Sequence, residues 1–168
     1  MSNDLISKSE FAALFENANK SDESKDKLWF TLADRIIRFR EDISSSSLKA
    51  LTSGQSALIC CAGFRRGAQY DFLTSITQSE LPGLTLKALE TLQAAEYLDL
   101  LRKTEAVFKG KKFPEYPEDM VAALQKQPDG YFDRIAEQFV TGKGMKRPLR
   151  EYVYDYVTAH PQDFCASS

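Results

Sequence analysis

The chain has 168 residues, 43% of them apolar, and its 24 acidic and 22 basic side chains give a formal net charge of −2. This apolar fraction excludes an intrinsically disordered chain, and the length fits one domain. The near-neutral charge excludes a strong overall attraction to nucleic acid. No apolar run approaches the ~20 residues that a membrane-spanning helix needs.

Apolar residues recur at helical spacing along almost the whole chain. Ser7 and Glu10 have the spacing of a capping box, which predicts the start of the first helix. The second helix carries a wide apolar stripe that includes Trp29, the only tryptophan, which we expect to anchor the core. The predicted helices cover residues of about 7–18, 25–41, 48–64, 68–78, 84–108, 117–126, 131–140 and 148–160.

Glycine and proline indicate the boundaries between these helices. We expect the third helix to end near Gly63 or Gly67, and the segment 79–83, which ends in Pro-Gly, to interrupt the chain. A join near Gln93 divides the long helix that follows. Pro117 is placed to lie in the first turn of the next helix, where its missing N–H costs nothing.

The sequence shows neither period-two alternation nor long β-branched runs, so no strand is predicted. We therefore predict an all-α fold, a single-domain helical bundle of about seven to nine helices that spans residues 1–168. Short ends at about 1–6 and 165–168 are predicted to be disordered, and Phe164 is expected to fold back onto the body.

The sequence offers few residues for catalysis. His160 is the only histidine, and its place at the end of the last helix is typical of a C-terminal cap. A zinc site built from His160, Cys60, Cys61 and Cys165 lacks any paired ligands at short spacing with suitable geometry. We therefore expect no metal site, no cofactor and no enzymatic activity; a hydrolase or transferase with an unfamiliar site is the remaining enzyme hypothesis.

The three cysteines indicate a reducing compartment. Cys60 and Cys61 are neighbours, and neighbours rarely pair because the disulfide would close a strained ring. They stand in an apolar segment, where thiols usually act as small buried hydrophobes; a redox or metal role is the alternative. Residues 1–5 do not resemble a secretory signal. We therefore expect a cytoplasmic protein.

Candidate binding residues stand outside the apolar stripes. Arg65 and Arg66 form a basic pair that is either a solvated helix end or an anchor for an acidic partner, since arginine binds carboxylate or phosphate with two hydrogen bonds. Tyr154 falls outside the apolar stripe of the last helix, so we expect it to face solvent, where tyrosine suits a protein interface.

The segment 67–72, Gly-Ala-Gln-Tyr-Asp-Phe, resembles a motif of a bacterial DNA-mimic-protein-like domain family, most of whose members are uncharacterised. The family pattern is Asn-Gly-Gly-aromatic-x-Gln-Tyr-Phe, which Gln69 and Tyr70 match. Residues 87–92 resemble the helix that follows, and the likeness extends over roughly 28–164. One family member is a DNA mimic that binds a transcriptional regulator, so the resemblance implies a helical fold and a non-enzymatic binding role. Gln69 and Tyr70 are also candidate partner-binding residues, because they are polar or aromatic positions that the apolar stripes leave outward.

Two departures weigh on what the resemblance implies. Arg65 and Arg66 stand where the pattern has asparagine and glycine, and a net charge of −2 does not supply the dense acidic array of a DNA mimic. We therefore expect a non-enzymatic intracellular protein that neutralises or regulates a protein partner, as a bacterial toxin-immunity or inhibitor protein does. A DNA mimic or a nucleic-acid-associated transcriptional regulator, with the lysines of 109–112 as a further contact, is the alternative.

Overall fold

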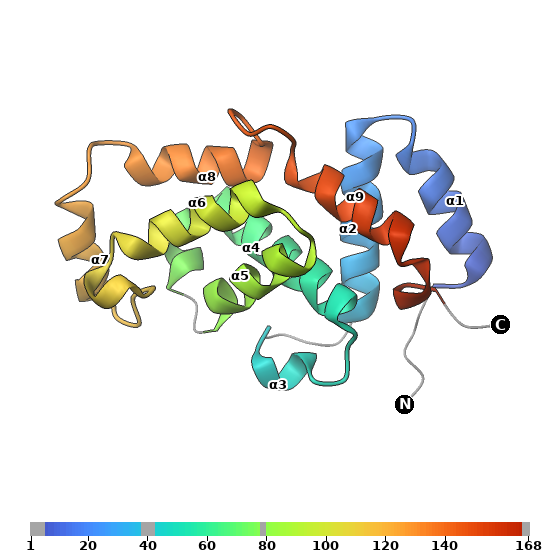
Figure 1. Cartoon of the computed structure of the whole chain (residues 1–168), viewed down its shortest axis with the longest axis horizontal. Coiled ribbons are helices and arrows are strands. Elements are labelled where there is room, and N and C mark those ends of the chain that lie inside the picture. The colour runs from blue at the N-terminus through green and yellow to red at the C-terminus, as the bar shows by residue number, and fades with distance from the viewer. Residues whose placement is uncertain (1–5, 38–42, 78–79, 166–168) are drawn as a thin grey trace.

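The structure is a computed structural model that describes residues 6–37, 43–77 and 80–165. The described residues form nine α-helices and two short 3₁₀ helices, η1 and η2, with no strand, which confirms the predicted all-α fold (Figure 1). In chain order these are α1 (Lys8–Ala18), α2 (Asp22–Ile37), α3 (Ser45–Leu48), α4 (Ser53–Ile76), α5 (Leu81–Thr91), α6 (Ala95–Ala106), η1 (Lys109–Lys111), α7 (Pro117–Leu124), α8 (Tyr131–Thr141), α9 (Leu149–Ala159) and η2 (Pro161–Asp163).

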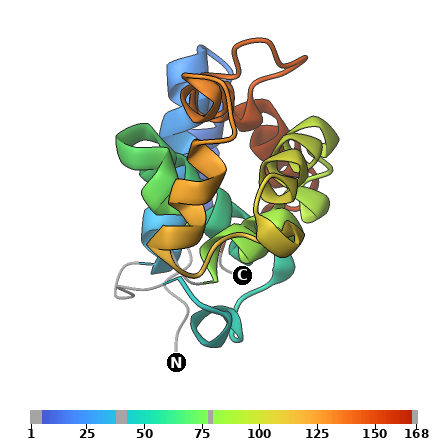
Figure 2. The ribbon, with the colours of Figure 1, turned by 90° about the vertical axis from the view of Figure 1, so that its left-hand side faces the viewer.

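The core is built around α4, which packs against α2, α5 and α8. On its outer side α2 packs against α1 and α9, so α2 and α4 together connect the two ends of the molecule (Figures 1 and 2). Trp29 on α2 is fully buried, as predicted, and its indole N–H donates to the carbonyl oxygen of Leu58 on α4 at 3.1 Å. The prediction that this helix continues to residue 41 lies outside the described residues.

The helix boundaries before α4 follow local capping signals. Ser44 and Ser47 form a capping box at the start of the single-turn helix α3, and Thr52 and Gln55 form a second capping box at the start of α4. The predicted start of this helix near residue 48 was therefore wrong. A threonine hydroxyl that accepts the free amide of Gln55 stabilises a new helix start, because it satisfies a donor that the helix leaves unpaired.

The predicted break near Gly63 or Gly67 was wrong, because α4 runs through both glycines and departs from helical geometry at Asp71. The glycines serve close packing instead. A Cβ atom at Gly67 would lie 2.3 Å from the hydroxyl oxygen of Ser75, so a larger residue there would force the Ser75 side chain to move. The Asp71 carboxylate accepts the amide of Leu73 at 3.1 Å and so caps the final turns of α4.

Later boundaries agree better with the sequence. Gln93, where a join was predicted, separates α5 from α6 with φ of +55°. Pro117 lies in the first turn of α7, as expected. Pro82 lies in the first turn of α5, so this helix begins at Leu81, earlier than the break predicted at Pro-Gly. Proline interrupts a helix only beyond its first turn, and here the position is N-terminal.

The ends of the described chain lie together. Ile6 is buried and forms an isolated parallel β-bridge with Cys165, and Phe164 folds back into the core as predicted. Disorder was therefore wrongly predicted for Ile6 and Cys165; the other residues of the predicted ends, 1–5 and 166–168, lie outside the described residues.

Candidate functional site

Arg65, one of the predicted binding residues, is part of the framework. Its guanidinium makes two hydrogen bonds to the Asp26 carboxylate, at 2.6 and 3.0 Å, and its Nε–H donates to the carbonyl oxygen of Val140 at 3.1 Å. It also lies 5.3 Å from the ring centre of Trp29. With only 13% of its side chain exposed, Arg65 joins α2, α4 and α8. The prediction of a solvated cap was wrong, and the donors that an acidic partner would need are already engaged.

Arg66 is the more accessible of the two arginines. It pairs with Asp34 on α2 at 2.9 Å and lies 4.7 Å from the ring centre of Phe30. The exposed fractions of the Arg66 and Asp34 side chains are 47% and 57%. An exposed pair of this kind is weak and exchanges partners readily, so Arg66 remains able to contact a second molecule.

Gln69 and Tyr70 are exposed on α4, just before its break at Asp71. The Tyr70 side chain is 88% exposed, the largest fraction among the exposed large hydrophobic residues of the described chain. Because Arg66 lies three and four residues before them, the three side chains share one face of the helix. The structure therefore brings together three of the five predicted binding residues.

Tyr154, the fifth predicted residue, lies elsewhere and does not face solvent as expected. Its ring is half-buried and stacks on Phe15 of α1 with 5.1 Å between ring centres, and its hydroxyl donates to Asn19. Lys25 lies 5.2 Å from the same ring centre. Tyr154 of α9 thus contacts α1, and helical periodicity cannot reveal this contact between the two ends of the sequence.

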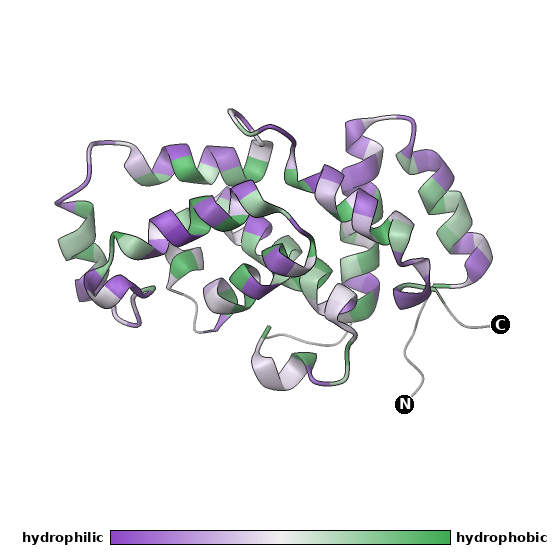
Figure 3. Cartoon of the chain, viewed as in Figure 1, coloured by the Kyte–Doolittle hydropathy of each residue, from purple (hydrophilic) through white to green (hydrophobic). Residues whose placement is uncertain are grey.

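A surface that the sequence analysis did not single out lies on α7, at one end of the molecule. Three large apolar side chains are exposed there, and we call them the α7 surface: Val121 and Leu124, which lie three residues apart on α7, and Tyr116, the N-cap of the helix. Val121 is 51% exposed although it is mid-helix and β-branched. Figure 3 shows α7 as a largely hydrophobic helix at the edge of the fold, with no helix outside it. Ala123 is buried on the opposite face, so α7 attaches to the body by one side only.

The α7 surface continues into a hollow of about 360 Å³. Leu124 lines it together with Leu73 from α4 and Tyr131 from α8, while Asp129 and Asp133 add acidic groups. An apolar base beside two carboxylates favours an apolar side chain that stands next to a basic one. The sequence contained the apolar spacing of residues 120, 121 and 124, but gave no sign that the outer side chains would stay uncovered.

His160 lines a second hollow, of about 590 Å³, between α9 and the join of α5 and α6. It occupies the C-cap of α9, as predicted, and its ring stacks on Tyr156 with 4.2 Å between ring centres. The other charged groups there pair with each other, since Arg147 contacts Asp155 at 2.7 Å. This arrangement stabilises the end of α9.

Beside this hollow, Glu96 holds the segment before α9. Its carboxylate accepts the amides of Lys146 and Arg147, at 2.8 and 3.1 Å, and the hydroxyl of Tyr152 at 2.9 Å. Partial burial raises the pKa of Glu96, but these three hydrogen bonds favour the ionised form and hold the pKa below its ordinary value. The Glu96 carboxylate thus stabilises the segment before α9 through three hydrogen bonds.

The thiols of Cys60 and Cys61 are buried, as predicted. Burial raises the pKa of Cys60 to about 12 and that of Cys61 well above its ordinary value, so both stay protonated at neutral pH. Across the part of the chain that the structure describes, no group of three or more His, Cys, Asp or Glu side chains could hold a metal ion.

Comparison with known proteins finds no matching family model, no matching curated protein and no matching solved structure. The resemblance of residues 67–72 to the DNA-mimic-like family therefore stays a prediction. Among the described helices, none combines the length and the apolar character that crossing a membrane requires.

Proposed function

We propose that this chain is a non-enzymatic intracellular protein that neutralises or regulates a protein partner, in the manner of a toxin-immunity or inhibitor protein, and that it binds the partner through the α7 surface. The observation that carries the proposal is the exposure of Val121 and Leu124 on α7 and of Tyr116 at its N-cap. Large apolar side chains that gather on a surface are typical of protein interfaces, with aromatic residues as anchors.

The charges around the α7 surface indicate the chemistry of the partner. Glu118 is exposed on α7 itself, and Asp129 and Asp133 line the hollow beside Leu124. Complementary charge speeds association and favours the correct partner. We therefore propose a partner that presents an apolar side chain within a basic surface. A basic protein such as a nuclease toxin has this character.

The alternative, a nucleic-acid-associated regulator, draws less support. Its proposed contacts included Arg65 and Arg66, and both guanidinium groups pair with carboxylates of α2. Phosphate would have to displace Asp26 from the less exposed arginine, at the cost of an unpaired half-buried carboxylate. DNA mimicry needs a dense array of acidic groups, and a net charge of −2 does not supply one.

The test begins with co-expression of the chain and the products of its neighbouring genes, followed by photo-crosslinking from position 121. We expect a crosslink to one basic protein, and no retention of DNA or RNA at low salt. Val121→Asp and Leu124→Asp should each weaken that complex at least tenfold, because they bury a charge against an apolar partner. Both positions are exposed, so the variants should fold normally.

A matched control adds the same charge elsewhere. Gln162→Glu lies on η2, near the opposite end of the molecule (Figure 1), and should bind like the unaltered chain. If Tyr70→Ser weakens the complex while the two α7 variants do not, the exposed face of α4 is the interface and the α7 assignment is wrong. If the chain binds nucleic acid at low salt and no protein, the whole proposal is refuted.

A further inference from the structure

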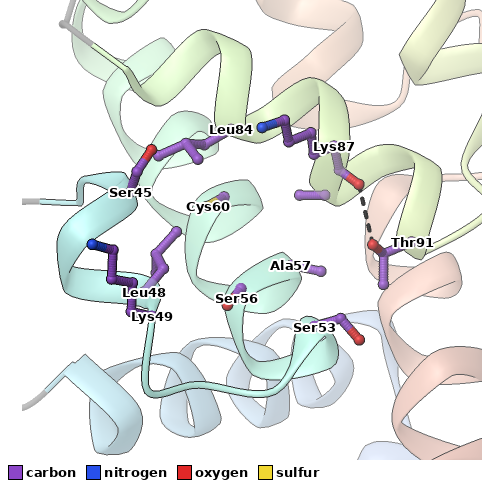
Figure 4. A pocket seen from close by; sticks show the side chains of 11 residues that line it. Ser45, Leu48, Lys49, Ser53, Ser56, Ala57, Cys60, Leu84, Lys87 and Thr91 are labelled. Carbon is purple, nitrogen blue, oxygen red and sulfur yellow. Dashed lines mark hydrogen bonds between the residues drawn. The ribbon is translucent and has the colours of Figure 1, made fainter.

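A pocket of about 310 Å³ lies between α3, α4 and α5, away from α7. Its base is apolar, formed by Ala57 and Cys60 of α4 and by Leu84 and Ala88 of α5, while Leu48 of α3 closes one side (Figure 4). Leu48 and Leu84 are only half-buried, so the short helix α3 covers the pocket incompletely. A ligand with an apolar body would complete this packing.

Two lysines from different helices flank the apolar base. Lys49 follows α3 and Lys87 lies on α5, and both residues line the pocket. Among the described residues neither lysine forms an ion pair, and both side chains are exposed. Two unpaired cations beside one apolar base favour a ligand with a negative charge.

The carboxylate nearest to this arrangement is Glu80. It accepts the backbone amide of Ser45 at 2.5 Å and so connects the start of α5 to the start of α3. Its negative charge also acts on Lys87. Lys49 and Lys87 are the only charged side chains among the described residues that line the pocket, and the Ser56 hydroxyl adds a hydrogen-bond donor.

We propose that this pocket binds a small amphipathic anion, a medium-chain carboxylate whose apolar chain lies on Ala57, Leu84 and Ala88 and whose carboxylate lies between Lys49 and Lys87. The volume fits roughly ten non-hydrogen atoms, since a water molecule occupies about 30 Å³. Octanoate has this size and charge. The site is separate from the α7 surface and does not depend on the protein partner.

The experiment titrates octanoate into the 168-residue chain and follows binding by calorimetry and by the methyl signals of labelled alanines. Ala57 and Ala88 line the pocket, so their methyl signals should shift with saturation while those of distant alanines stay fixed. Octanol and octylamine serve as probes without the negative charge, and inorganic phosphate serves as a probe without the apolar chain.

We expect Lys49→Gln and Lys87→Gln each to weaken octanoate binding about threefold, and the double variant about tenfold, as is typical for exposed ion pairs. The affinity should also fall as salt is added. Lys27→Gln, a change of another exposed lysine, is the matched control and should leave the affinity unchanged. Exposed lysines seldom matter for folding, so the variants should keep the thermal unfolding temperature of the unaltered chain.

Three results would overturn the assignment. The first is the absence of saturable shifts at Ala57 and Ala88 with millimolar octanoate. The second is equal binding of octanol or of phosphate alone, which would remove the need for one of the two parts of the ligand. The third is an unchanged affinity in the double variant, which would place the carboxylate elsewhere. Ser56→Phe, which fills the pocket, should abolish binding in a chain that remains helical by circular dichroism.

Discussion

Arg65 and Arg66 are neighbours in the sequence, but we expect them to contribute very differently to the free energy of unfolding. Arg65 and Arg66 each pair with a carboxylate of α2, but their side chains are 13% and 47% exposed. Replacing Arg65 by methionine keeps an apolar stem and removes the charge. We expect Arg65→Met to destabilise the fold far more than Arg66→Met.

The expected loss of stability follows from the polar groups that Arg65→Met leaves without a partner. Without it, the half-buried Asp26 carboxylate loses two short hydrogen bonds and the Val140 carbonyl oxygen loses one. Breaking a fully buried pair costs about 3–5 kcal/mol and an exposed pair about 0–1 kcal/mol, so this case falls at about 2–3 kcal/mol. Arg150, 3.9 Å from Asp26, remains to offset part of the loss. For Arg66→Met we expect less than about 1 kcal/mol.

Urea unfolding followed by the fluorescence of Trp29 measures both changes. The midpoint of Arg65→Met should fall by about 1 M, given a slope of about 2 kcal/mol per M, while the slope itself stays constant. Combining Arg65→Met with Asp26→Asn should cost clearly less than the sum of the two single changes, because each removes the same interaction. Equal midpoints for Arg65→Met and Arg66→Met would refute the structural role assigned to Arg65.

Two further predictions concern titrating groups. The pKa of Glu96 is lower in the folded chain, so its contribution is complete at neutral pH and is lost as the pH falls from about 4.5 through the folded pKa. Glu96→Gln should therefore lower the free energy of unfolding by about 1–2 kcal/mol at neutral pH, and this difference from the unaltered chain should become smaller below pH 4.5. Unfolding curves recorded across this pH range measure the difference, and a difference that does not depend on pH would contradict the prediction. Cys60 and Cys61 should resist a thiol reagent at about pH 8 in the folded chain and react fully in urea, whereas the half-buried Cys165 should react first. Mass spectrometry of the labelled peptides gives the order in which the three cysteines react, and early labelling of Cys60 would show that α4 opens.

The sequence by itself was sufficient for the fold class and for several helix ends. Helical spacing placed Trp29 in the core because the period of apolar residues along one helix records which face is buried. The first turn at Pro117 and the C-cap at His160 were also predictable, since these signals act within a few residues of the chain.

Only the tertiary structure decided which side chains remain available to a partner. The sequence suggested that Arg65 is solvated or available to a partner, but α2 places Asp26, which is 39 residues earlier in the chain, against it. Tyr154 was expected to face solvent, but Phe15 of α1 stacks on its ring. Val121 belongs to an apolar run on α7, yet within the described part of the chain it stays 51% exposed. Periodicity records the two faces of a helix, whereas exposure depends on neighbours that are distant in sequence, and their positions follow from the packing of the whole chain.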